Sequence, residues 1–205
     1  MNIAFFKKKK VLISAAIVLL AALVLIAAFW VLRSTTLFGK PTLTVETPPK
    51  KAFGDAEPFS VEMTVSSLGQ ALYPAASFSI EFDSSHLEFL GVEEGNIRIS
   101  GEQTNQSLPD WSVNVEKSNK DGKINIIYVD QTGGKYAFSK SLLAKSDNVV
   151  LRLRFRLRGS ARVGEVYPLT VTDAVFAASD ETQSLATVRG TLRVRNGKII
   201  VGDAS

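Results

Sequence analysis

Residues 76–95 read ASFSIEFDSSHLEFLGVEEG, and this stretch contains the pattern that decides the fold. Phe78, Ile80 and Phe82 alternate with polar residues, which is the period of a β-strand that has one side in the core and the other in water. The polar turn Asp83–His86 follows, and a second apolar run comes after it. The stretch therefore predicts two strands joined by a polar turn.

The same period of two recurs from Thr42 to the end of the chain, whereas helical periodicity is confined to one predicted turn at Ser139–Lys145. Glycine-containing pairs separate several of the runs and supply the positive φ values that tight turns need. Many short strands with such turn signals predict an all-β sandwich or barrel. The other predicted strands are Leu43–Thr47, Phe59–Val65, Trp111–Glu116, Lys123–Val129, Val149–Leu157, Tyr167–Thr172, Ala174–Ala178, Thr187–Val194 and Lys198–Val201, with turns at Gly54-Asp55, Asp121-Gly122, Gly133-Gly134 and Asn196-Gly197.

An uncharged apolar segment precedes these strands. Val11–Leu32 holds 22 residues without a charge. A helix of that length spans about 33 Å, enough for the hydrocarbon core of a bilayer. Four lysines, Lys7–Lys10, come directly before it, so we expect the N-terminus in the cytoplasm and the β-domain outside the cell membrane. A cleavable signal peptide is the alternative, although its apolar region is usually about 7–15 residues long.

The sequence accordingly predicts a single-pass membrane protein in five parts. Residues 1–10 are a basic cytoplasmic segment, 11–32 the transmembrane helix, 33–41 a short spacer, 42–201 one β-domain and 202–205 a tail. Because the spacer is short, we expect the domain to lie close to the bilayer.

Composition limits the functions open to the domain. The chain has no cysteine, which excludes a disulfide framework and a cysteine-based zinc site. Residues 1–33 carry five basic and no acidic residues, so the remainder has a net charge of −1 although the whole chain has +4. Nucleic-acid binding requires a basic domain and is not predicted. No cofactor and no metal site are predicted either.

Catalytic patterns are weak. His86 is the only histidine, and its neighbours Asp83 and Ser85 in a turn rarely reach the geometry of a catalytic triad. The carboxylates of Glu93-Glu94 would point to opposite faces of a strand. Lys117–Gly122 resembles part of a calcium loop but lacks its acidic first position, and a hairpin turn is the better interpretation. The sequence therefore predicts a protein that is not an enzyme.

Arginines alternate with apolar residues in the run LRLRFRLR at positions 151–158. As a strand, this run buries one side and aligns the arginines along the other. The arginines either pair with acids on neighbouring strands or contact an anionic surface such as lipid head groups or wall polymers. They are Arg152, Arg154, Arg156 and Arg158.

Two other functions stay open at this stage. Trp111, Tyr73, Tyr128 and Tyr136 could stack on sugar rings if they lay coplanar on one face, which would make the domain a carbohydrate-binding module for wall or external glycan. A structural subunit of an envelope assembly is the other alternative, because a short spacer suits packing against neighbours.

Five segments carry a further pattern, in the order PTLTVETPPKKAFGDAEPFSVEMTVSSL (41–68), ASFSIEFDSSHLEFLGVEEG (76–95), KINIIYVDQTGG (123–134), VVLRLRFRLRGSARVGEVYPLTVTDAVFA (149–177) and GTLRVRNGKIIV (190–201). Their order and spacing resemble the cohesin domain family, the jelly-roll module that binds dockerin modules in cellulosomes. The resemblance covers nearly the whole predicted domain.

The resemblance implies a nine-stranded jelly-roll β-sandwich that captures a partner protein without catalysis. It implies a binding face that includes the strands around Ala75–Phe82 and Ile124–Asp130. Ala75, Ala76 and Ser77 stand where well-known dockerin-binding members carry Asn or Asp, so a partner other than dockerin is an equal alternative. The residues implied for the face are Ala75, Ser77, Ser79, Glu81, Asn125, Tyr128 and Asp130.

Overall fold

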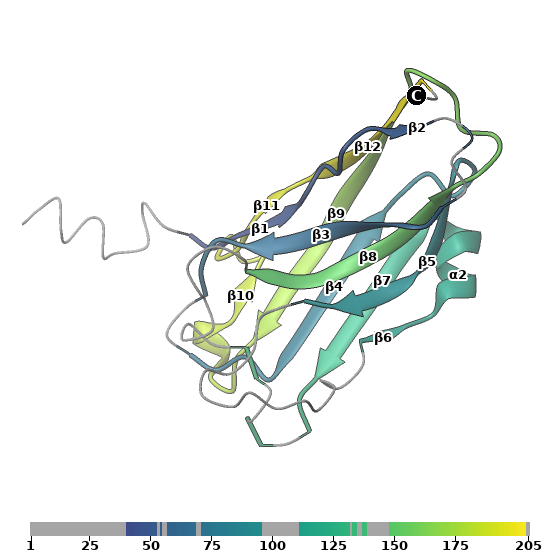
Figure 1. Ribbon diagram of the computed structural model, residues 1–205. Coiled ribbons are helices and arrows are strands. Elements are labelled where there is room, and N and C mark those ends of the chain that lie inside the picture. Colours follow the sequence, from purple (N-terminus) through teal and green to yellow (C-terminus); the bar gives the residue numbers. More distant parts are fainter. Residues whose placement is uncertain are drawn as a thin grey trace, which may run out of the picture. The chain divides into compact units, whose positions relative to one another are not determined.

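Two β-sheets pack face to face in the computed structural model of this protein (Figure 1). The structure describes residues 40–52, 54, 57–68, 71–95, 111–131, 133–134, 137–138 and 148–203. All of them except Lys40 belong to one compact unit, Pro41–Ser205. The predicted anchor Val11–Leu32 lies outside the described residues, and none of the helices described is long and apolar enough to cross a bilayer.

The first sheet has five strands in the order β11-β1-β3-β8-β5. β11 pairs with β1 in parallel, and the other neighbours are antiparallel. The bounds are β1 (Thr42–Val45), β3 (Phe59–Val65), β5 (Leu87–Glu94), β8 (Val149–Leu157) and β11 (Arg193–Arg195).

The second sheet has seven strands, six of them in the order β2-β12-β9-β4-β7-β6, with β10 also paired to β9. β4 lies between β9 and β7 and is antiparallel to both. The strands are β2 (Lys51–Ala52), β4 (Ala75–Glu81), β6 (Ser112–Val113), β7 (Lys123–Val129), β9 (Val166–Ala177), β10 (Leu185–Ala186) and β12 (Gly197–Gly202). The turn Asp83–His86 thus carries the chain from one sheet to the other, since β4 and β5 lie in different sheets.

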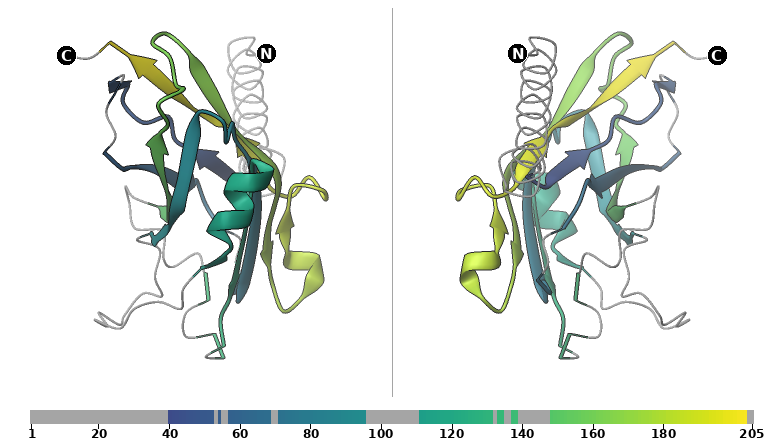
Figure 2. Two further views of the ribbon diagram at one scale, coloured as in Figure 1. Left: turned by 90° about the vertical axis from the view of Figure 1, so that its right-hand side faces the viewer. Right: turned by 90° about the vertical axis from the view of Figure 1, so that its left-hand side faces the viewer.

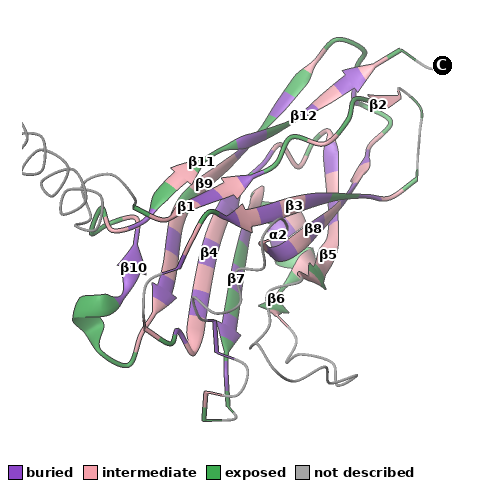
Figure 3. Cartoon of the chain, turned by 60° about the vertical axis from the view of Figure 1, so that its left-hand side comes forward, coloured by how far each residue is buried: buried purple, intermediate pink, exposed green. Residues whose placement is uncertain are grey.

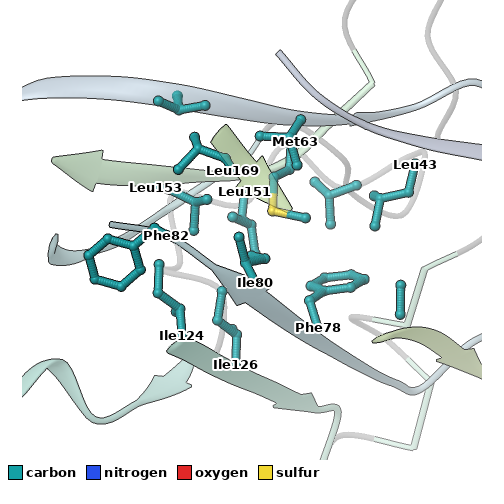
Figure 4. Close-up of a cluster of buried hydrophobic side chains, with 14 of the residues drawn as sticks. Leu43, Met63, Phe78, Ile80, Phe82, Ile124, Ile126, Leu151, Leu153 and Leu169 are labelled. Atoms are coloured by element: carbon teal, nitrogen blue, oxygen red, sulfur yellow. The ribbon is translucent and has the colours of Figure 1, made fainter. Parts of the chain in front are cut away.

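The core lies between the sheets and follows directly from the alternation in the sequence. Buried and more exposed residues alternate along β3, β4, β7 and β8, which appears as purple stripes across the strands in Figure 3. In Figure 4, Met63 and Leu151 of the first sheet approach Ile80 and Phe78 of the second. All four side chains are at most 1% exposed. Burying one such side chain contributes roughly 1.5–3 kcal/mol, so the sandwich has a continuous apolar core and needs no disulfide.

A helix occupies the segment that the sequence assigned to a strand and a hairpin turn. α2 (Val115–Asp121) begins at Asn114, whose side chain accepts a hydrogen bond from the backbone N–H of Lys117 at 2.8 Å, and ends at Gly122 with φ 65°. The expectation of a hairpin at Lys117–Gly122 was therefore wrong, because an Asn cap and a left-handed glycine are also helix boundaries. Figure 2 shows α2 in teal in profile. A short 3-10 helix, η2, covers Glu181–Gln183.

Three other expectations about strands need correction. The described residues hold twelve strands instead of nine, since short pairings such as β2, β6 and β10 leave no periodic signal. Thr187–Val194 is mostly turn, and only its end joins β11. Asn196-Gly197 is not a hairpin, because it links β11 of one sheet to β12 of the other. Gly197 is required there for another reason: a Cβ would lie 2.6 Å from the carbonyl oxygen of Val45. The predicted turn at Ser139–Lys145 lies outside the described residues.

Candidate partner-binding face

The outer surface of β9, β4 and β7 forms the candidate site, which we call the β4 face. Residues paired across a sheet project to the same side, and the registers align β9, β4 and β7 in four transverse rows. The rows are Ala177–Ala75–Val129, Val175–Ser77–Ile127, Asp173–Ser79–Asn125 and Thr170–Glu81–Lys123. The strands around Ala75–Phe82 and Ile124–Asp130 are thus immediate neighbours, and five of the seven predicted face residues project from this surface.

The first two rows of the β4 face are apolar apart from Ser77. Ile127 is 53% exposed and Val129 51% exposed, and both lie on β7. Val175 on β9 is half-buried on the far side of Ser77. Exposed aliphatic side chains that occur together, instead of singly, are typical of surfaces that bind another protein. This end of the face therefore offers apolar area that folding has left in water.

The other two rows are polar and largely paired within the face. The Ser79 hydroxyl donates to Oδ1 of Asn125 at 2.8 Å. Lys123 Nζ lies 4.0 Å from Glu81 Oε1, and both side chains are exposed. Oδ1 of Asp173 accepts a hydrogen bond from the Thr187 hydroxyl at 2.9 Å. The β4 face thus changes from apolar to polar along the strand direction, over a length of about 20 Å for four rows.

Small side chains lie along the middle of the face. Ala75, Ser77 and Ser79 on β4 are half-buried, whereas Ile127 and Val129 on the adjacent strand are exposed. The short β4 side chains leave backbone and Cβ atoms within reach of a partner. Alanine at position 75 cannot donate or accept a hydrogen bond through its side chain, so recognition at this end has to rely on apolar contact.

Two of the predicted face residues lie elsewhere. Tyr128 is only 3% exposed and points into the core, where its ring packs 5.0 Å from that of Phe138 and 5.2 Å from that of Trp111. Asp130 is 9% exposed, and its Oδ2 accepts a hydrogen bond from the backbone N–H of Gly134 at 2.7 Å. Both residues lie where they support the fold below and beside the β4 face.

The arginines of the run at 151–158 lie in β8 or directly after it, and each has a partner. Arg152 Nε is 2.9 Å from Glu62 Oε1, and Arg154 Nη1 is 2.9 Å from Glu93 Oε1. Arg156 Nη1 lies 3.6 Å from Glu88 Oε2. Arg158 Nε donates to the carbonyl oxygens of Ser84 at 3.0 Å and Leu87 at 3.3 Å. Three of the four arginines therefore pair with acids on neighbouring strands, which is one of the two alternatives that the sequence left open. Contact with an anionic surface stays a prediction.

The turn that holds His86 has a fixed geometry, but it is not that of a triad. Nδ1 of His86 lies 2.7 Å from Asp83 Oδ2 and 2.9 Å from Ser85 Oγ. A triad places the acid and the nucleophile on different ring nitrogens, whereas here both contact the same one. The Ser85 hydroxyl also donates to Asp83 Oδ1 at 2.5 Å, and this bond, assisted by the one from His86, lowers the pKa of the Asp83 carboxyl.

The aromatic residues proposed for sugar stacking do not form an exposed platform in the described part of the chain. Tyr73 is 1% exposed and Tyr128 3% exposed. Trp111 packs against Phe78 with ring centroids 5.6 Å apart and at 34° to it. Tyr136 lies outside the described residues. The buried tyrosines cannot stack on a sugar, and carbohydrate binding gains no support from them.

Sequence reasoning overlooked Ile127, Val129, Val175 and Asp173, which give the β4 face its apolar and acidic parts. The signal was present for β7: in KINIIYV, Ile124, Ile126 and Tyr128 form the buried set, which leaves Ile127 and Val129 outside. The β9 residues could not be assigned in this way, because a bulge between Asp173 and Val171 reverses the alternation within the strand.

Comparison with known proteins finds one family and several related folds. The model of the Cohesin domain matches residues 42–194. A cohesin of Acetivibrio cellulolyticus, solved in complex with a dockerin, is 20% identical with a TM-score of 0.57, and the match covers 79% of this chain and 99% of that one.

A cohesin–dockerin complex of Clostridium thermocellum is 17% identical with a TM-score of 0.57, covering 80% and 99% of the two chains. A type I cohesin of Pseudobacteroides cellulosolvens is also 17% identical with a TM-score of 0.57, covering 80% and 94%. At these identities the likeness establishes the β-sandwich fold. A search of curated protein sequences finds no match.

Proposed function

This chain belongs to the cohesin domain family, and from that premise we propose that it is a membrane-tethered, non-catalytic module that captures a dockerin-bearing protein on its β4 face. The observation that carries the proposal is the exposed apolar half of that face, with Ile127 and Val129 more than half exposed beside Val175. Apolar area left in water by folding becomes favourable binding free energy when a partner covers it.

Two considerations support a dockerin as the partner. Similar structures of the same fold were solved as complexes with dockerin modules. The β4 face also presents side chains from three adjacent strands, and so offers a surface to a folded module instead of a single free edge to an extended peptide.

Tethering rests on the sequence of the first 33 residues. The 22-residue apolar segment Val11–Leu32 is long enough to span a bilayer, and Lys7–Lys10 favour a cytoplasmic N-terminus. A module held in this way would retain its partner at the cell surface.

The proposal predicts that a charge placed in the apolar half of the β4 face disrupts binding. The full-length chain in uncharged detergent is titrated with a panel of calcium-loaded dockerins by isothermal calorimetry. We expect micromolar or tighter binding to at least one of them, and a loss of about 2 kcal/mol, or about 30-fold, for Ile127→Asp, because a buried carboxylate would lack a partner.

Arg154→Gln is the matched control, since it changes an exposed residue of the opposite sheet. Its affinity should stay within about twofold of the wild type, because the residue lies outside the proposed interface. Equal losses for the two variants would reject the β4 face, and binding to none of the dockerins would reject dockerin as the partner.

A further inference from the structure

A second candidate site lies at the end of the sandwich where β8 turns into β9. The turn forms a surface recess of about 460 Å³ lined by His86, Gly159, Ser160, Ala161, Arg162 and Val163. It combines the only histidine of the chain, from the turn between β4 and β5, with an arginine from the turn between β8 and β9. None of these lining residues belongs to the β4 face, so the recess is a separate site.

Several contacts hold the His86 ring in one orientation. Nδ1 contacts Asp83 Oδ2 at 2.7 Å, and the ring stacks on that of Tyr167 with centroids 4.9 Å apart and an interplanar angle of 19°. The backbone carbonyl of His86 accepts a hydrogen bond from the N–H of Arg158 at 2.8 Å. Because the pKa of Asp83 is lowered, its carboxylate is ionised and Nδ1 carries the proton that it donates.

The second ring nitrogen, Nε2, has no hydrogen-bond partner among the residues that the structure describes. A ring nitrogen that is fixed in place and unbonded is available to a ligand. With Nδ1 protonated, Nε2 accepts a hydrogen bond in the neutral ring and donates one in the imidazolium.

Arg162 supplies a fixed positive charge to the same recess. Its backbone N–H donates to the Tyr167 hydroxyl at 3.2 Å, which anchors the turn, and no described acid forms an ion pair with its guanidinium. The arginines of β8 differ in this respect, since Arg152, Arg154 and Arg156 all have carboxylate partners. Arg162 thus has donors that folding has not used.

We propose that the recess binds an oxyanion, a phosphate or a carboxylate group, between the Arg162 guanidinium and the imidazolium of His86. Arg–oxyanion pairs are strong because two N–H groups can donate in parallel. In the imidazolium, the N–H at Nε2 is a second charged donor beside the guanidinium.

The other charged groups near His86 leave a positive balance for the ligand. Asp83 faces the ring from its own turn, and Glu165 accepts a hydrogen bond from the hydroxyl of the stacked Tyr167. Arg158 and Arg162 come from the facing turn. With His86 protonated, three positive charges face two negative ones, and with His86 neutral the charges balance. The protonated ring therefore gives the recess a net positive charge that suits an anionic ligand.

The single histidine gives a clean assay, because its two ring C–H signals in an NMR spectrum belong to His86 alone. The full-length chain in uncharged detergent is titrated with inorganic phosphate and, separately, with acetate, at constant ionic strength set with sodium chloride. We expect a saturable shift of the His86 signals, because the ligand would lie against Nε2 of the ring.

The two ligands identify the source: a response to phosphate alone assigns a phosphate ligand, to acetate alone a carboxylate, and to both a general oxyanion site. Arg162→Gln should weaken the affinity at least about tenfold, whereas Arg193→Gln, which removes an exposed arginine from β11, should leave it unchanged. A shift that never saturates, or one that is equal in the wild type and Arg162→Gln, would overturn the proposal.

Discussion

The two outer surfaces of the sandwich differ in whether their side chains have partners within the fold. On the first sheet, three arginines of β8 alternate with the acids of β3 and β5 in ion pairs at 2.9–3.6 Å. On the second sheet, the β4 face leaves Ile127 and Val129 more than half exposed. One surface pairs its charged side chains within the fold, whereas the other leaves apolar side chains exposed to water.

This difference shows that an unusual run of charged residues in the sequence can be paired within the fold. The arginine stripe is the least ordinary feature of the sequence, yet its charges are largely balanced by neighbours. The β4 face carries no unusual sequence run, and its apolar half arises because β9, β4 and β7 align Val175, Ser77 and Ile127 in one row. This alignment depends on the register of strand pairing, which cannot be predicted from amino-acid composition.

The largest expected effect is a difference in stability between substitutions on the buried side and on the outer side of β8. Phe155 is fully buried on β8, with the rings of Phe82 and Phe89 at 5.5 and 5.6 Å, whereas its neighbour Arg154 points outward. Phe155→Ala should lower the free energy of unfolding by about 3–5 kcal/mol, because it leaves a cavity. Arg154→Ala should cost less than about 1 kcal/mol. Urea denaturation of both variants measures the contrast, and similar losses would contradict the inside–outside assignment of β8.

A smaller effect tests whether the ion pairs of the β8 arginines contribute to the stability of the fold. Arg152 Nε and Glu62 Oε1 are 2.9 Å apart on adjacent strands, and both side chains are about one-third to one-half exposed. A double-mutant cycle with Arg152→Gln and Glu62→Gln should give a coupling energy of about 0.2–1 kcal/mol, because solvent screens the pair. The coupling should shrink in molar salt. A coupling energy of zero at low salt would mean that the stripe is not balanced by its neighbours.

The sequence predicted the sandwich and the membership of the β4 face better than the roles of individual residues. Period-two alternation is a local property, so β3, β4, β7 and β8 were found where their buried residues lie. Tyr128 was placed on the face although it is buried, because the family resemblance named a strand without its register. α2 was missed because an Asn cap and a glycine stop over seven residues are also turn signals.

Long-range effects account for the rest. The bulge at Thr172 shifts the register of β9 against β4, so Asp173 and Thr170 come to lie on the same face although they are three residues apart. The recess at His86 joins the turn after β4 to the turn after β8, more than seventy residues further along the chain. Neither relation has a signal within a short window of sequence.

The smallest predicted effect concerns Asp83, in the turn that joins the two sheets. Hydrogen bonds from Ser85 and then from His86 lower its pKa, whereas partial burial opposes them. A carboxyl with a lower pKa in the folded state than the value of about 3.9 in an unfolded chain stabilises the fold above that value. This stability is lost as pH falls through the folded-state pKa.

Asp83→Asn should therefore lower the free energy of unfolding near neutral pH by less than about 0.5 kcal/mol, since the side chain is 36% exposed and screened by water. The difference from the wild type should shrink as the pH falls through the folded-state pKa of Asp83. Asp203→Asn, which removes the same charge just after β12, controls for net charge. Urea denaturation at a series of pH values measures both variants. If the difference in free energy of unfolding between Asp83→Asn and the wild type stayed constant across that pH range, ionisation of the Asp83 carboxyl would not contribute to the stability of the turn between the two sheets.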